Sequence, residues 1–137
     1  MKGTRVAPKS VAEKLLIKPN TSIWLSHAEH LARIEPLPEG ARMVEGLGQA
    51  IVALVVAESA AAVRAILTAH ADQLAAPSIF WVAYPKANKA DINRDTLWPI
   101  LTEYGLRPIS QVAIDEVWSA LRFRPLKPGE APFTGGQ

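Results

Sequence analysis

The chain has 137 residues, of which 49% are hydrophobic and 20% are charged, and this size and composition fit a single domain with a buried core. The 15 basic and 13 acidic residues leave a net charge of only +2, and the basic residues form no cluster, which argues against a nucleic-acid partner. The absence of cysteine excludes disulfides, thiol catalysis and cysteine-bound zinc. No apolar run approaches the ~20 residues of a membrane span and the N-terminus has no apolar signal core, so we expect a soluble cytoplasmic protein without a membrane partner.

The first half of the chain predicts short elements joined by loops. In chain order these are a flexible tail over residues 1–9, a helix over 10–16, a strand over 22–26, a helix over 27–34 and a strand over 41–45. Ser10 and Glu13 have the spacing of a capping box, in which each side chain accepts a hydrogen bond from the backbone N–H of the other residue. Pro36 and Pro38 favour a rigid loop before the second strand, because a proline lacks an N–H and fixes φ.

The second half predicts a β-α-β unit followed by a helix and a hairpin. Its elements are a strand over residues 50–57, a helix over 58–75, a strand over 78–84, a helix over 91–104 and strands over 107–114 and 117–124. The first of these strands, AIVALVVA, has no alternation, which is typical of a strand buried on both faces. Pro99 predicts a kink or a late start in its helix, and Gly105 predicts a cap at the helix end. Only Asp115 and Glu116 separate the last two strands, so these strands must form an antiparallel hairpin.

Together these elements predict an α/β fold. The strands over residues 50–57 and 78–84 are joined by a helix, an arrangement that favours parallel pairing through a right-handed crossover. We therefore expect a three-layer, mostly parallel sheet that ends in a C-terminal antiparallel hairpin. The predicted domain spans residues 10–125, and the residues from 126 to 137, which are rich in proline and glycine, are expected to form a flexible C-terminal tail.

Several segments resemble those of known families. The segments SIFWVAYPK (78–86), YGLRPISQVAI (104–114) and VWSALRFRP (117–125) resemble the later half of class I S-adenosylmethionine-dependent methyltransferases in the order of their elements. This resemblance implies a Rossmann-like, methyltransferase-like sheet. The segments VAEKLLIKPNTSIWL, IFWVAYPK and IDEVWSALRF together resemble a family of short uncharacterised bacterial proteins. That second resemblance implies a compact, truncated form of the same sheet and brings no known activity.

The methyltransferase resemblance also implies where a cofactor would bind. Those enzymes have a glycine-rich turn after their first strand, so that the backbone and the next helix N-terminus can approach the cofactor. Here the first strand runs directly into His27, and no glycine lies between Gly3 and Gly40. Glu45 ends the second strand, where an acidic residue could hold the ribose hydroxyls. No cofactor is therefore predicted, and Glu45 is the cofactor-binding candidate of the alternative interpretation.

A group of charged residues follows the strand over residues 78–84. These residues are Lys86, Lys89, Asp91 and Arg94. Ligands of open α/β sheets bind outside the carboxyl ends of the strands. Asp91 could cap the amides of the next helix, which would leave Lys89 and Arg94 beside a partly positive helix N-terminus that suits a phosphate or a carboxylate. The alternative is a solvated loop in which Arg94 pairs with Asp91 or with Asp95, a kind of exposed pair that stabilises little.

Other polar residues give weaker signals. His27 and His30 have HxxH spacing, but catalytic zinc needs three protein ligands and no third ligand stands out, so no metal site is predicted. Asp115 and Glu116 are neighbours in a predicted turn, so Asp115 is expected to form the turn and Glu116 to be solvated. Ser119 lacks the G-x-S-x-G pattern of an exposed nucleophile.

The sequence therefore leaves three functions open. The favoured prediction is a non-enzymatic binding or regulatory module that recognises an anionic metabolite or a protein partner, because no catalytic set of residues is evident and no catalytic residue is assigned. The alternatives are a degenerate S-adenosylmethionine-dependent methyltransferase-like enzyme and a homodimeric structural protein. Trp98 lies beside Pro99 on a helix and is expected to be partly exposed, which suits a partner or dimer contact.

Overall fold

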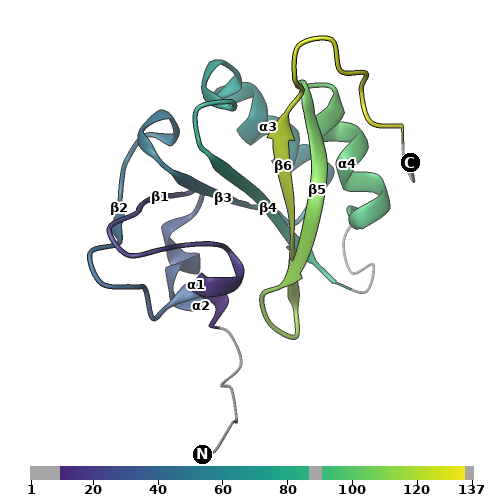
Figure 1. The fold of residues 1–137 in the computed structure, drawn as a ribbon. Coiled ribbons are helices and arrows are strands. Elements are labelled where there is room, and N and C mark those ends of the chain that lie inside the picture. The colour runs from purple at the N-terminus through teal and green to yellow at the C-terminus, as the bar shows by residue number, and fades with distance from the viewer. Residues whose placement is uncertain (1–9, 87–90, 135–137) are drawn as a thin grey trace, which may run out of the picture.

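A computed structural model describes residues 10–86 and 91–134. The described chain forms a six-stranded sheet in the order β2-β1-β3-β4-β6-β5, with helices on both faces (Figure 1). The strands are β1 (Ser22–Leu25), β2 (Arg42–Met43), β3 (Val52–Val56), β4 (Ile79–Pro85), β5 (Leu106–Ala113) and β6 (Trp118–Pro125). The helices are α1 (Val11–Lys14), α2 (Leu31–Ile34), α3 (Ala60–Ala69) and α4 (Arg94–Thr102), with 3-10 turns η1 (Ala28–His30), η2 (Leu47–Gln49) and η3 (Ala71–Gln73).

The pairing of the strands confirms the predicted fold class. The strands from β2 to β4 pair in parallel, whereas β6 pairs antiparallel with both β4 and β5. The β5–β6 hairpin is the one required by the short link at Asp115 and Glu116. Asp115 forms this turn, because its Oδ1 accepts hydrogen bonds from the backbone N–H groups of Val117 and Trp118, both at 2.8 Å.

The sheet separates two apolar layers. Every residue of β3 is buried, as its continuous apolar sequence predicts. On one face, Val63 and Leu67 of α3 and Leu97 of α4 pack against the sheet. On the other face, α1 and α2 contribute Ala12 and Ile34 to a second cluster. Figure 1 shows these two helix pairs on opposite sides of the strands.

Several elements are shorter than their sequence pattern predicts. The helix predicted over 58–75 ends at Ala69, because His70 leaves the helical conformation at φ −120° and the chain continues in η3. The strand predicted over 41–45 keeps only two residues in β2. The helix predicted over 91–104 begins at Arg94, after the cap at Asn93, and keeps Pro99 inside it. Gly105 follows α4 at φ +80°, a conformation that favours glycine and ends the helix.

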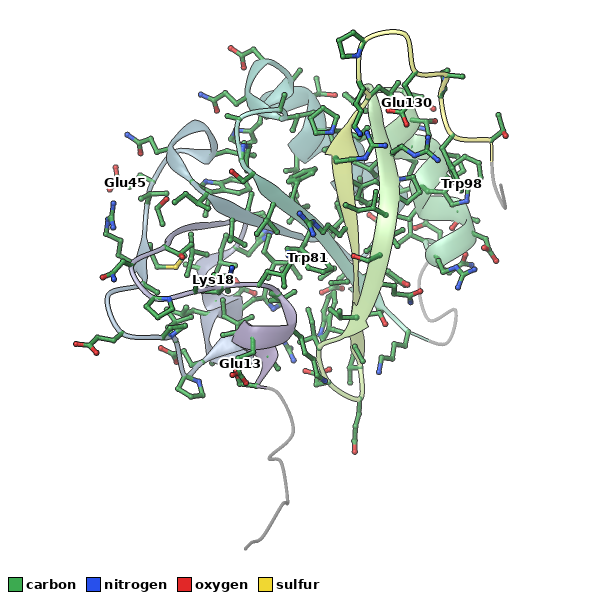
Figure 2. All side chains as sticks on the ribbon, in the orientation of Figure 1. Glu13, Lys18, Glu45, Trp81, Trp98 and Glu130 are labelled. Atoms are coloured by element: carbon green, nitrogen blue, oxygen red, sulfur yellow. The ribbon has the colours of Figure 1, made fainter. Side chains whose placement is uncertain are left out.

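Part of the predicted C-terminal tail packs against the domain. Glu130 Oε2 accepts hydrogen bonds from Arg107 at 2.7 Å and from Arg124 at 2.8 Å. The ring of Phe133 meets the ring of Trp98 edge to face, with 4.8 Å between their centroids. Figure 2 shows Trp98 and Glu130 on the same side of the molecule, where the chain passes β5 and α4. The domain boundaries themselves stay predictions. None of the helices in the described chain has the length and apolar character to cross a membrane.

The Glu130 contacts predict a specific response to acid. Hydrogen bonds from Arg124 and from the backbone of Lys127 lower the pKa of Glu130 from its usual 4.5 to about 2. A carboxyl group with a lowered pKa in the folded state stabilises that state above its unfolded pKa and loses this contribution as the pH falls through its folded pKa. The Glu130 contacts are therefore expected to persist at pH 4.5 and to be lost only as the pH approaches 2. A carboxyl-carbon NMR titration of Glu130 measures this directly, and a midpoint near 4.5 would contradict the ion pairs.

Candidate functional site

The topology of the sheet marks one place for a ligand. From β1 the chain moves outward to β2, then returns past β1 to β3 and continues outward in the opposite direction to β4. The order of strands therefore reverses between β1 and β3. In open α/β sheets the two connections diverge at such a point and leave a crevice outside the carboxyl ends of the strands, where ligands bind.

A pocket of about 260 Å³ lies at this point. Its walls come from the residues that follow β1, from the residues that end and follow β3, and from the first turn of α3. They are His27, Glu29, His30, Val56, Ala57, Glu58 and Ala62. The apolar part is contributed by Val56 and Ala57, which are buried, while the charged part is contributed by Glu29 and Glu58, which are exposed.

Ser26, the residue before His27, links the ends of β1 and β3 beside this crevice. Its backbone N–H donates to Leu54 O at 3.0 Å, and its Oγ accepts a hydrogen bond from the backbone N–H of Val56 at 2.8 Å. The Ser26 side chain thus continues the β1–β3 pairing for one more step. A glycine-rich turn after β1 would supply no such side chain, so a serine hydroxyl contact replaces the glycine turn that lets the backbone approach a ligand.

The Ser26 contact gives a prediction about stability. Val56 is 4% exposed, so Ser26→Ala leaves the buried backbone N–H of Val56 without its acceptor. We expect a loss of about 1–3 kcal/mol of unfolding free energy, the usual cost of an unsatisfied buried donor. Urea unfolding measures the loss. Ser78→Ala, at an exposed serine before β4, is the matched control and should change stability by less than about 0.5 kcal/mol. Equal effects for both variants would rule out the Ser26 contact.

Each of the two histidines of the pocket has a polar neighbour at its Nδ1 atom. Arg33 Nε donates to His30 Nδ1 at 2.9 Å, so the neutral ring of His30 carries its proton on Nε2. Burial, followed by the nearby charge of Arg33, lowers the pKa of His30, which keeps this ring neutral at pH 7. His27 Nδ1 lies 3.0 Å from Ser26 Oγ, and the edge of the His30 ring meets the Trp118 ring with 5.4 Å between centroids. His30 therefore presents a hydrogen-bond donor, and the carboxylates supply the acceptors.

The HxxH spacing of His27 and His30 also raises the question of a metal site. Their rings meet edge to face with 6.2 Å between centroids. In the part of the chain that the structure describes, no three His, Asp or Glu side chains gather as a metal site would require.

Of the residues predicted to bind an anion, the three that the structure describes have separate surroundings, and only Arg94 lines the pocket that it borders. The prediction that Asp91 caps its own helix is wrong, because Asn93 caps α4 and Asp91 Oδ1 accepts a hydrogen bond from Ala60 N at 2.8 Å, at the start of α3. The backbone N–H of Lys86 donates to Val117 O at 2.7 Å, beside the β5–β6 turn. Arg94 lies at the start of α4 and pairs weakly with Asp95, at 3.9 Å. Lys89 lies outside the described residues, and an anion site that includes it stays a prediction.

Glu45 lies apart from the pocket. It follows β2, is exposed and does not line the crevice. Figure 2 shows it on the β2 side of the molecule, opposite Trp98 and Glu130. A ligand that reached Glu45 would have to extend from the pocket across the ends of β1 and β2. Ser119 is 6% exposed within β6, which agrees with its interpretation as a sheet serine.

The sheet order and the crevice together define a methyltransferase-like α/β fold. Neither protein-family models nor curated proteins match the sequence. Solved structures do match the fold. One is Sp1610 of Streptococcus pneumoniae, a proposed tRNA (m1A22) methyltransferase, with a TM-score of 0.54 and 14% identity over 91% of this chain and 70% of that one.

Two other solved structures extend this comparison. The tRNA (m1A22) methyltransferase TrmK of B. subtilis matches with a TM-score of 0.51 and 12% identity over 84% of this chain and 63% of that one. LepI, in a complex with SAH (S-adenosylhomocysteine) and a substrate analogue, matches with a TM-score of 0.51 and 12% identity over 84% of this chain and 39% of that one. At these identities the comparisons establish the fold, and they confirm the expected truncated methyltransferase-like sheet.

These neighbours correct the functional prediction. The sequence favoured a non-enzymatic binding module because it lacks a glycine-rich turn and a catalytic set of residues. The solved structures that share the fold include methyltransferases, and one of the matching structures holds SAH. The prediction of a non-enzymatic module was therefore wrong, and the methyltransferase-like alternative is the better supported one.

Sequence reasoning missed the acidic half of the site. Glu29 and Glu58 were not proposed as ligand contacts, because a single acidic residue after a strand or in a helical segment is common. The signal was available in the topology. Glu29 follows β1 and Glu58 follows β3, the two strands on either side of the reversal in strand order. Because β1 and β3 are parallel, their carboxyl ends lie at the same edge of the sheet.

Proposed function

We propose that this chain is an S-adenosylmethionine-binding, methyltransferase-like enzyme whose cofactor binds in the crevice between β1 and β3. The observation that carries the proposal is the position of the 260 Å³ pocket at the reversal of strand order in a sheet of methyltransferase type. When bound, S-adenosylmethionine (SAM) would supply an activated methyl group. A cytoplasmic location stays a prediction that accompanies this proposal.

The charge of the pocket suits this cofactor. The sulfonium and the ammonium groups of SAM are both positive, and the described walls of the pocket contribute two carboxylates, those of Glu29 and Glu58. The side chains of these residues would bind the positive groups through charge-assisted interactions. His30 would donate a hydrogen bond from Nε2 to a ligand oxygen or nitrogen, since its Nδ1 is already engaged by Arg33.

The size of the pocket limits how the cofactor would lie. A volume of 260 Å³ falls just below the ~300–1,000 Å³ typical of small-molecule sites, so part of the ligand would remain outside it. The adjacent surface leads over the ends of β1 and β2 toward Glu45. We propose that Glu45 contacts this outer part of the ligand. Glu45 would then bind the ribose hydroxyls, as the sequence predicts.

The proposal is tested by comparing SAM with SAH by isothermal titration calorimetry. SAH lacks the methyl group and the sulfonium charge, so the wild-type protein should bind SAM about fivefold more tightly. The double variant Glu29→Gln/Glu58→Gln should lose this preference and bind SAM at least about tenfold more weakly.

Glu116→Gln is the control for general electrostatic effects. Glu116 is an exposed acidic residue in the β5–β6 turn, at the same edge of the sheet, and it does not line the pocket. This variant should bind both compounds as the wild type does. Absence of binding by the wild type at millimolar SAM would refute the proposal. An unchanged preference in the double variant would move the cofactor to another place.

Self-association through the sheet edges is not the function we propose. The edge strand β2 has only two residues. The other edge strand, β5, contains Pro108 and has an irregular register between Pro108 and Ser110. A proline and a bulge are features that protect an edge strand from pairing with a second chain. A homodimer or another protein partner that uses a different surface stays a prediction.

A further inference from the structure

A second and larger cavity lies on the other side of the molecule. It occupies the groove between α4 and β5, has a volume of about 550 Å³, and shares no lining residue with the pocket between β1 and β3. The groove is lined mostly by apolar and aromatic side chains and carries charge at one end. The lining residues used in the argument are Arg94, Trp98, Ile109, Gln111, Leu121 and Phe133. The volume is within the range of small-molecule sites.

The floor of this groove is rigid. Leu121 of β6 is 5% exposed and belongs to the apolar core. Gln111 of β5 is held by a hydrogen bond from its Nε2 to the hydroxyl oxygen of Tyr84, at 2.7 Å. Tyr84 itself is 3% exposed on the central strand β4. The polar side of the groove is therefore positioned by the sheet, and a ligand would not have to order it on binding.

The aromatic walls come from distant parts of the chain. Trp98 lies on α4, whereas Phe133 belongs to the C-terminal segment, and their rings meet at an interplanar angle of 80°. The Arg107 guanidinium lies over the Phe133 ring, 5.3 Å from its centroid. The Glu130 ion pairs with Arg107 and Arg124 hold this segment against the sheet. Docking of the segment thus completes the groove with a second aromatic ring.

One end of the groove carries an available positive charge. Arg107 and Arg124 both form ion pairs with Glu130, at 2.7 and 2.8 Å, so their guanidinium groups are already engaged. Among the described residues, the ion pair of Arg94 is a 3.9 Å contact with Asp95, and the two side chains are 68% and 85% exposed. An ion pair of that length and exposure is weak, so an incoming anion can compete for the Arg94 guanidinium. The Asp95 carboxylate would oppose such an anion.

We propose that this groove binds a small molecule with a flat aromatic ring and an acidic group. The ring would lie against Trp98 and Phe133, and the acidic group would meet Arg94. An aromatic ring is favoured against such a wall because stacked and edge-to-face contacts add to the burial of apolar area. The site goes beyond the proposed cofactor pocket and uses Arg94, one of the residues that the sequence marked for anion binding.

The test uses two probes that differ in one charge. Indole-3-acetate and its neutral amide, indole-3-acetamide, are titrated into the full chain while the indole N–H signal of Trp98 is followed by NMR and assigned with Trp98→Phe. We expect saturable shifts of Trp98 with a dissociation constant on the order of 1 mM for the acid. The acid should bind about fivefold more tightly than the amide, because only the acid can pair with Arg94.

Four variants separate the contributions. Arg94→Gln should remove the preference for the acid, and Asp95→Asn should increase it. Phe133→Ala should weaken both probes about tenfold through loss of the aromatic wall. Arg42→Gln removes an exposed arginine on β2 and should change neither probe. The proposal is overturned if Trp98 shows no saturable shift up to about 10 mM probe, or if Arg94→Gln keeps the wild-type preference. Neither outcome bears on SAM binding, which is measured at separate residues.

Discussion

Replacing Ala62 with Phe should abolish SAM binding while the protein remains folded. Ala62 is half-buried in the first turn of α3 and lines the pocket between β1 and β3. A phenyl group at this position would fill much of a 260 Å³ space that is also lined by the buried residues Val56 and Ala57. We expect the affinity for SAM to fall more than about a hundredfold, because an occupied pocket cannot accept the cofactor without displacing close-packed atoms.

Ala61→Phe is the matched control for this variant. Ala61 is the preceding residue of α3, is exposed and does not line the pocket. Both substitutions carry the same helix-propensity cost of about 0.5 kcal/mol. Calorimetric titration with SAM measures the difference between them. Equal affinities for the two variants would show that the cofactor, if it binds, does so elsewhere.

The largest loss of stability is expected for Trp81→Ala. Trp81 lies at the centre of β4, is 1% exposed and packs in the layer that α1 and α2 cover. Its Nε1–H donates to Leu15 O at 3.0 Å, which ties the end of α1 to the sheet. Removal of a fully buried indole costs about 3–5 kcal/mol through lost burial and the cavity that remains. Urea unfolding followed by circular dichroism measures this cost.

Two further variants separate the causes. Trp81→Phe keeps most of the apolar volume and removes the hydrogen bond to Leu15, so it should cost about 1–3 kcal/mol. Trp98→Ala removes an indole that is only half-buried on α4, and its cost should be clearly smaller than that of Trp81→Ala. A loss below about 2 kcal/mol for Trp81→Ala would contradict the packing described above.

The fold could be predicted where one physical signal dominates. The apolar run of β3 predicts a strand buried on both faces, and β3 is buried throughout. The two-residue link at Asp115 and Glu116 requires an antiparallel hairpin, and β5 and β6 form one. The capping box of Ser10 and Glu13 was also found, because it depends only on local spacing. Local patterns predicted most of the elements. The rule that β-α-β crossovers are right-handed predicted the parallel pairing of β3 with β4.

The failures concern contacts between segments far apart in the sequence. Asp91 was expected to cap the helix that follows it, and it caps α3, which precedes it by about 30 residues. The partners of Glu130 lie on β5 and β6, and no local pattern reveals that this acidic residue holds the C-terminal segment in place. The pocket between β1 and β3 arises in the same way, since Glu29 and Glu58 come to line one pocket only when the strands pair. Such juxtapositions follow from tertiary packing and leave little trace in sequence periodicity.

The functional prediction failed for a related reason. It treated the missing glycine turn as evidence against a cofactor site. Ser26 shows what replaces that turn in this chain, namely a side chain that continues the pairing of β1 with β3. The carboxyl ends of these strands still form a pocket, and its charge comes from acidic side chains in place of a helix N-terminus, because Asp91 already occupies the first amide of α3.

The most direct test of the proposed cofactor site is to locate SAM on the protein by NMR. Intermolecular nuclear Overhauser effects between SAM carrying a carbon-13 methyl group and the alanine methyl groups of the protein report which residues it contacts. We expect contacts from SAM to the methyl groups of Ala57 and Ala62, in the pocket between β1 and β3. Contacts only to Trp98 and Phe133, or no binding at millimolar SAM, would contradict it.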